Sequence, residues 1–138
     1  MERLKDFLSE KTNSDIYNIY YKYIGLLKKD IKISYIDTIK ELNHDNEKLT
    51  IIVTRELKFT PKNFFSLAVS YYVEHFLKDE YIGIFDWEKF DLSKEINDDI
   101  KYYSLNKMSR ISLLISQITS SFGYNPIVTP PMFILPKK

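Results

Sequence analysis

Three consecutive segments, 31–39, 49–59 and 67–77, alternate apolar and polar residues, and this pattern constrains the fold more than any other feature of the sequence. In the clearest segment the apolar positions are Leu49, Ile51, Val53, Leu57 and Phe59. A period of two puts alternate side chains on opposite faces of a β-strand. Turn-forming residues separate the segments at 44–46 and 61–63. The sequence therefore predicts an antiparallel meander of three strands with one face buried.

Two stretches outside the meander follow a helical period. In 14–29, apolar residues recur at steps of three and four, and Ser14 provides a helix start signal. The second stretch has the clearest apolar face in the chain, formed by Met108, Ile111, Leu114, Ile115, Ile118 and Phe122. Its expected N-cap is Ser104 or Asn106, and its expected stop is Gly123. We therefore predict one helix before the sheet and one long helix after it.

The remaining segments connect or flank these elements. Residues 1–13 are interpreted as a mobile or weakly helical lead-in, and 81–85 as a short fourth strand or a bulged continuation of the third. Residues 86–101 are acidic and predict a loop with a helical turn. Prolines in 125–136 fix the backbone and remove N–H donors, so this tail is expected to run extended. The prediction is one α+β domain over 1–138: an antiparallel three- to four-stranded sheet, an N-terminal helix, a long C-terminal helix and a Pro-rich tail.

Composition argues against several kinds of chemical site. The chain has no cysteine, which excludes disulfides, thiolate metal sites and a cysteine nucleophile. Its three glycines are too scattered for a phosphate-binding loop. His44 is expected in a solvated turn and His75 as a satisfied edge histidine on the apolar side of the third strand, and neither has metal-ligand or triad spacing. We expect no catalytic residues, no metal and no cofactor, and a small enzyme whose site forms only in three dimensions stays open as an alternative.

Charge argues against an anionic partner. The 20 Lys and Arg residues nearly balance 19 Asp and Glu, whereas nucleic acids and anionic membranes attract a basic excess. No run reaches the roughly 18 apolar residues of a membrane span, so we expect no membrane insertion and a cytoplasmic protein.

Two alternative kinds of charged binding surface stay open. One is RNA binding by basic residues with tyrosine platforms, namely Lys32, Lys40, Arg55, Lys58, Tyr71 and Tyr72. The other is an acidic docking patch within 79–99 for a basic partner.

Aromatic residues make up 15% of the chain, including 11 Tyr and 9 Phe. Part of this aromatic surface belongs in the core, and the tail itself can pack over the sheet as core. Alternatively, the aromatic and Met-bearing tail forms an adaptable apolar groove for extended chain segments, because Met and aromatic side chains repack easily around different partners. The candidate contact residues are Tyr71, Phe76, Tyr124, Pro130, Met132, Phe133 and Ile134.

The segment 109–133, SRISLLISQITSSFGYNPIVTPPMF, resembles the C-terminal signature of the SecB-like protein-export chaperones. In that family an arginine-containing helix ends at a glycine and is followed by an apolar segment interrupted by prolines. Arg110 and Gly123 match the first two features, and Pro126, Pro130 and Pro131 match the third. Upstream, LTIIVTRELKF and SLAVSYYVEHFL resemble strands of the family's sheet, so the similarity spans 31–134.

This resemblance implies a holdase, a chaperone that binds unfolded or pre-secretory polypeptides in apolar grooves and assists protein export without chemistry or nucleotide. It also implies a homotetramer built as a dimer of dimers, with the SecA export motor as a partner. A helix before the sheet is more similar to the SecB-like proteins that accompany toxin–antitoxin pairs. A dedicated chaperone of an antitoxin is therefore the alternative within the same fold.

Overall fold

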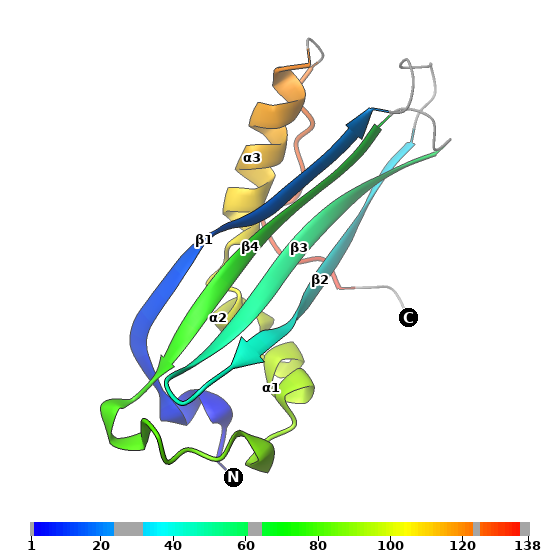
Figure 1. Cartoon of the computed structure of the whole chain (residues 1–138). Helices are drawn as coiled ribbons and strands as arrows, with labels where there is room; N and C mark the ends of the chain where they lie inside the picture. The colour runs from blue at the N-terminus through cyan, green and yellow to red at the C-terminus, as the bar shows by residue number, and fades with distance from the viewer. Residues whose placement is uncertain (1, 24–31, 61–64, 123–124, 136–138) are drawn as a thin grey trace.

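A four-stranded antiparallel sheet forms the centre of the computed structural model, which describes residues 2–23, 32–60, 65–122 and 125–135. The strands are β1 (Leu8–Tyr23), β2 (Lys32–His44), β3 (Lys48–Thr60) and β4 (Phe65–Leu77). Their spatial order is β1-β4-β3-β2 (Figure 1). The last three strands in sequence form the predicted antiparallel meander, and β1 pairs with the free side of β4.

The helices and the C-terminal tail lie on one face of this sheet (Figure 1). The α-helices are α1 (Leu92–Asp98), α2 (Ile100–Tyr103) and α3 (Met108–Ser120). Short 3-10 helices occur at η1 (Leu4–Phe7), η2 (Asp79–Tyr81) and η3 (Trp87–Lys89). The tail, 125–135, contains no helix or strand, in agreement with the predicted extended segment. The α+β class, the sheet and the long C-terminal helix are therefore as predicted.

The core lies between the helices and the covered face of the sheet. Alternate positions of β3 and β4 are buried there, beginning with Leu49 and Ile51 on β3 and Phe65 and Leu67 on β4. Helix α3 contributes the apolar face that its periodicity predicted, of which Met108, Ile111 and Ile115 are almost completely buried. Burial of each such side chain contributes about 1.5–3 kcal/mol to folding. This core fixes α3 and the start of the tail relative to the sheet.

The predicted helix over 14–29 is wrong, because residues up to Tyr23 belong to β1 and 24–29 lie outside the described residues. A β-bulge explains the misleading spacing. The register shifts between Ile16 and Asn18, so Ile16 pairs with Tyr71 and Ile19 with Val69, two positions apart on the same face of β4. The bulge therefore puts residues three apart on one side of a strand, which imitates a helical step. Isoleucine and tyrosine also favour strands when a pairing edge is available.

Several smaller predictions also need correction. The lead-in is helical only in η1, and β1 begins at Leu8, within the predicted lead-in; Leu4 is completely buried. Residues 81–85 form the end of η2 and a turn, not a strand. Helix α3 begins after Lys107, and neither Ser104 nor Asn106 caps it with a side chain. The predicted stop, Gly123, lies outside the described residues.

Candidate polypeptide-binding groove

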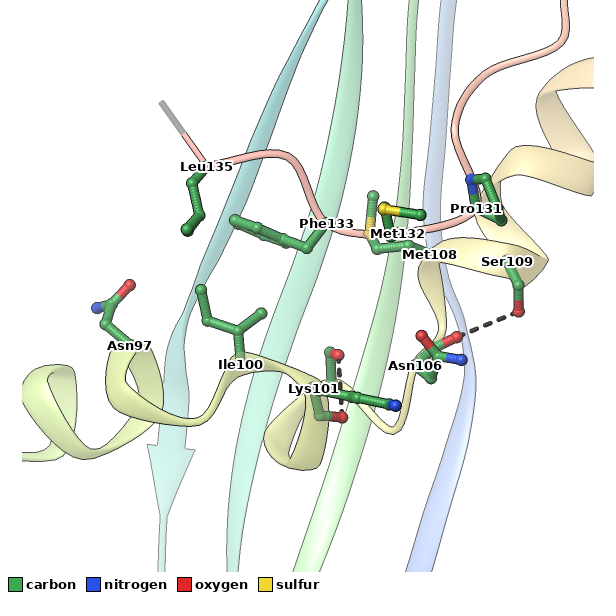
Figure 2. A pocket seen from close by; sticks show the side chains of 11 residues that line it. Asn97, Ile100, Lys101, Asn106, Met108, Ser109, Pro131, Met132, Phe133 and Leu135 are labelled. Carbon is green, nitrogen blue, oxygen red and sulfur yellow. Dashed lines mark hydrogen bonds between the residues drawn. The ribbon is translucent and has the colours of Figure 1, made fainter. Parts of the chain in front are cut away.

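An open groove of about 660 Å³ lies where the tail passes the α2 and α3 helices (Figure 2). One side of the groove comes from α1, α2 and the start of α3, and the other comes from the tail. Its lining residues are Asn97, Ile100, Lys101, Ser104, Asn106, Met108, Ser109, Pro131, Met132, Phe133 and Leu135. The lining is mainly apolar, and Lys101 is the only charged residue among those named. Such a surface suits an apolar ligand held by many weak contacts.

The helical side of the groove depends on a tight connection between α2 and α3. Leu105 and Asn106 both adopt positive φ, at 49° and 55°. This left-handed conformation is uncommon outside glycine, and asparagine tolerates it better than leucine. The turn is closed by the Asn106 N–H, which donates to the Lys101 carbonyl at 3.2 Å. It brings Met108 and Ser109 beside the α2 residues in the groove.

Helix α2 is fastened to the sheet by a buried histidine. The Nε2–H of His75 on β4 donates to the Tyr103 carbonyl at 2.8 Å, and the Tyr102 ring stacks on the imidazole at 5.2 Å between centroids. Burial lowers the pKa of His75, since the charged form loses its hydration. The predicted satisfied edge histidine is therefore only partly correct. His75 lies on a central strand, and its Nδ1 is buried without a hydrogen-bond partner among the described residues. It supports the helical side of the groove and does not line it.

The tail side of the groove is held by a buried ion pair. Arg55 on β3 and Asp37 on β2 stand opposite each other in the strand register, and both side chains are completely buried. The guanidinium donates to both carboxylate oxygens at 2.7 Å, and Tyr35 covers it with its ring. We call these two residues the clamp, because they also bind the tail.

Residues 129–134 of the tail, here called the strap, pass directly over the clamp. Arg55 donates to the Thr129 hydroxyl at 2.8 Å, to the Pro130 carbonyl, and to the Met132 carbonyl at 2.9 Å. The Ile134 N–H donates to the Asp37 carboxylate at 2.8 Å. The strap is therefore attached to two strands of the sheet through its backbone.

Helix α3 holds the beginning of the tail at two further points. The Ser112 hydroxyl donates to the Thr129 carbonyl at 2.5 Å. About two helical turns further along α3, the Thr119 hydroxyl accepts the Ile127 N–H at 2.8 Å. Both side chains lie on the buried face of α3. The tail thus follows α3 before it crosses the sheet.

The structure brings only part of the predicted contact set together. Met132 and Phe133 line the groove, next to Pro131. Pro130 and Ile134 belong to the strap, where their backbone groups bind the clamp.

The other candidates lie elsewhere. Tyr71 is half-buried and packs against the core, whereas Phe76 lies beneath the ammonium groups of Lys11 and Lys48. Phe76 alternates with the buried residues of β4 and so occupies the opposite face of the sheet. Tyr124 lies outside the described residues.

Sequence reasoning missed the helical lining residues and the clamp. A signal for the clamp was present: Asp37 and Arg55 both occupy positions with the parity of the buried face, between Tyr35 and Ile39 and between Val53 and Leu57. The RNA-binding alternative counted Arg55 among the accessible basic residues, but its side chain is completely buried. Lys58, another basic residue of that alternative, forms an ion pair with Glu56 on the other face of the sheet.

A second hollow, of about 490 Å³, lies near the N-terminus and is lined by Glu2, Phe7, Tyr81, Ile84, Phe85, Asp86, Lys89 and Phe90. We call it the aromatic hollow. Phe7 is its centre, with ring centroids 4.9 Å from Tyr81, 5.1 Å from Phe85 and 5.8 Å from Phe90.

Within the described ranges, no three His, Asp or Glu side chains gather as a metal site. None of the described helices has the length and hydropathy to span a membrane.

Comparison with known proteins identifies the architecture. The SecB-like chaperone Rv1957 of Mycobacterium tuberculosis, solved in complex with a ChAD peptide from the Rv1956 HigA1 antitoxin, matches over 86% of this chain and 86% of that chain, with a TM-score of 0.60 and 6% identity. This chain has a SecB-like fold. The resemblance seen in 109–133 is thereby confirmed at the level of the fold.

Other comparisons add little to the SecB-like assignment. A protein of unknown function from Streptococcus agalactiae matches over 87% of this chain and 97% of that chain, with a TM-score of 0.38 and 9% identity. Neither the protein-family models nor the curated protein sequences contain a match to this sequence. At such low identity a structural match establishes a fold, so the function has to be argued from the groove.

Proposed function

We propose that this protein is a holdase chaperone that binds extended apolar segments of unfolded polypeptides in the groove between the helices and the strap. The observation that carries the proposal is the open, mainly apolar groove whose tail side is an extended segment with exposed apolar side chains. Met132 and Leu135 line it and remain 62% and 66% exposed. Apolar side chains left in water gain free energy when an extended ligand covers them. The SecB-like fold supports the same assignment.

Binding of this kind requires no chemical step. Many partial contacts to Met, Phe and Leu side chains add up to affinity without demanding one sequence, because such side chains adapt their shape. A protein that binds only the unfolded form of a client shifts the client's folding equilibrium toward that form. In the cytoplasm, such a protein would keep a pre-secretory client competent for export, with a motor such as SecA receiving it.

Aggregation of an unfolded client tests the proposal. α-Lactalbumin unfolds when its disulfides are reduced with dithiothreitol in the assay, and its aggregation is followed by light scattering. An equimolar amount of this protein is expected to suppress the scattering, whereas a natively folded protein at the same concentration provides the control for crowding. Unchanged scattering at several-fold excess would contradict holdase activity.

A dedicated antitoxin chaperone is the second candidate, and one observation favours it. The matching mycobacterial protein was solved with a peptide from an antitoxin. A panel of labelled peptides from unrelated apolar segments separates the two roles. A general holdase binds most of them with similar affinity, whereas a dedicated chaperone binds one by a large margin and ignores the rest.

The free edge of β1 supports assembly into a homo-oligomer. This strand has 16 residues and, among the described residues, pairs with β4 alone. It exposes Ile16, Tyr17, Ile19, Tyr20, Tyr21 and Tyr23. A long apolar edge strand is a template for pairing with another chain. We therefore propose that two copies join through β1 and that two such pairs form a tetramer. Light scattering coupled to size-exclusion chromatography measures the mass, and a particle of 16.5 kDa would contradict this assembly.

A further inference from the structure

The clamp binds the strap mainly through the strap's backbone. Two carbonyls, those of Pro130 and Met132, accept from Arg55, and the Ile134 N–H donates to Asp37. These groups occur at every second residue. In an extended chain, alternate residues direct their backbone polar groups to the same side. The strap therefore lies with one polar edge against the clamp.

This arrangement uses the whole guanidinium. Its five N–H groups bind the two oxygens of Asp37, the Thr129 hydroxyl and the two strap carbonyls. A guanidinium is planar and holds its donors in a fixed fork, so acceptors bound to it have little freedom to move. The position of the strap backbone is thus set by strands β2 and β3.

Stability of the sheet does not account for the clamp. A buried ion pair loses hydration that its mutual attraction barely restores, and apolar side chains of similar volume often serve a core equally well. The surrounding positions on both strands carry apolar or aromatic residues, among them Tyr35, Ile39, Val53 and Leu57. What an apolar pair cannot supply is directional hydrogen bonding to the strap.

We propose that Arg55 and Asp37 are the positioning residues of the groove, because they hold the strap backbone so that Met132 and Phe133 form the wall against which a client segment packs. This inference rests on the proposed function of the groove. The clamp does not touch the client: it keeps the wall in place while the Met132 and Phe133 side chains adapt. An unclamped strap would leave the helical side of the groove without an opposing surface.

The test replaces the clamp by an apolar pair. In the double variant Arg55→Met/Asp37→Leu no buried charge is left unpaired, so the sheet is expected to fold. The probe is a fluorescein-labelled synthetic peptide rich in Leu and Phe, and its affinity is measured by fluorescence anisotropy. We expect the double variant to bind about tenfold more weakly or worse, at unchanged urea stability of the sheet. The matched control, Lys58→Met/Glu56→Leu, removes an exposed ion pair from the opposite face and is expected to bind normally.

Equal affinity of the double variant and the unmodified protein would overturn the positioning role alone. Failure of the unmodified protein to bind any such peptide would overturn the proposed function and this inference with it. Arg55→Lys covers the case in which the double variant does not fold. Lysine keeps a cation beside Asp37 but lacks the fork that reaches both strap carbonyls, so several-fold weaker binding is expected. Full affinity of Arg55→Lys would again contradict the role.

A measurement on the unmodified protein gives an independent check. The Ile134 amide is bound to Asp37, and its hydrogen exchange is followed by NMR with and without the peptide. If the strap is the wall of the groove, exchange slows severalfold when the peptide packs against it. Faster exchange in the presence of peptide would show that clients displace the strap, which would overturn the proposal.

Discussion

The groove and the aromatic hollow are both partly apolar depressions, but their walls are built differently. In the aromatic hollow the rings contact one another: Phe7 meets three other rings within 5.8 Å, and Phe85 also meets Trp87 at 4.8 Å. In the groove the Met132 side chain is 62% exposed, while the backbone beneath it is bound to the clamp. The hollow thus has a fixed surface, and the groove has a fixed backbone with free side chains.

The aromatic hollow keeps its side chains in one arrangement, whereas the groove keeps only the backbone of the strap in place. Interlocked rings resist rearrangement because each holds its neighbours in place. A backbone bound at alternate residues can stay in place while its side chains change rotamer, which suits a surface that has to accept different sequences. Under the proposed function, changes in the groove should alter peptide binding, and changes in the aromatic hollow should alter stability. The following predictions test this difference, from the largest expected effect to the smallest.

The largest effect is expected when one half of the clamp is removed. Arg55→Met leaves the Asp37 carboxylate buried without its partner, and breaking a buried pair in this way costs about 3–5 kcal/mol. Urea unfolding monitored by Trp87 fluorescence measures the loss. The double variant Arg55→Met/Asp37→Leu is the control and should show the urea stability of the unmodified protein. A loss below about 1 kcal/mol in the single variant would show that Asp37 is not isolated from water.

Truncation in the aromatic hollow is expected to affect stability without affecting binding. Phe→Ala in a full core costs about 3–5 kcal/mol, and Phe85 is half-buried, so Phe85→Ala should cost about 2 kcal/mol. Peptide affinity in the groove should stay the same. If Phe85→Ala weakens peptide binding in a protein that still folds, the hollow belongs to the binding surface and the comparison fails.

A charge in the groove is expected to weaken peptide binding with little effect on stability. Met132→Asp puts a carboxylate where an apolar client must pack, and its desolvation should weaken peptide binding by about 1.4 kcal/mol, or tenfold. Stability should change by less than about 0.5 kcal/mol, because the side chain is exposed. Val128→Asp is the matched control, since Val128 is a 77% exposed tail residue that does not line the groove. Equal loss of binding in both variants would point to a general charge effect.

The smallest effect concerns pH and the support of α2. Burial lowers the pKa of His75 in the folded protein, so below about pH 6.5 the unfolded chain binds a proton that the folded chain does not. Stability is therefore full above pH 6.5 and falls as the pH drops toward the folded pKa, by at most about 1.4 kcal/mol per pH unit. Unfolding midpoints between pH 7 and 5 measure this slope.

A histidine variant identifies the group responsible. His75→Gln should remove the part of the slope due to this residue. An unchanged slope in His75→Gln would mean that protonation elsewhere controls the acid response. Peptide binding should weaken only where the protein begins to unfold, because His75 lies behind the groove.

The sequence predicted those parts of the fold in which local pattern and tertiary environment agree. The meander and α3 each bury one regular face, so a period of two or of 3.6 residues identifies them. In β1 the pattern misled us, since the bulge near Ile16 and Asn18 changes the side-chain spacing. Helix propensity offered no correction, because pairing with β4 determines the conformation of this segment.

The groove was only half predictable for a similar reason. Met132 and Phe133 stand out in the sequence as apolar residues in a segment whose prolines prevent it from forming a helix. Ile100 and Lys101 of α2 meet Met108 and Ser109 of α3 in the groove because the α2–α3 turn, with positive φ at Leu105 and Asn106, brings the two helices together, and no pattern in the chain indicates that turn. The clamp could have been predicted by looking for charged residues at positions that belong to the buried face of a strand. Asp37 and Arg55 occupy such positions.

The paired prolines of the strap limit how a captured chain can be held. Neither Pro130 nor Pro131 has an N–H, and the carbonyl of Pro130 is already occupied by Arg55. A guest lying along this segment therefore finds no continuous row of main-chain donors with which to grow a β-ladder. Under the proposed function, aggregation-prone chains would be contacted here through their side chains, on a surface that gives a nascent fibril no template to extend.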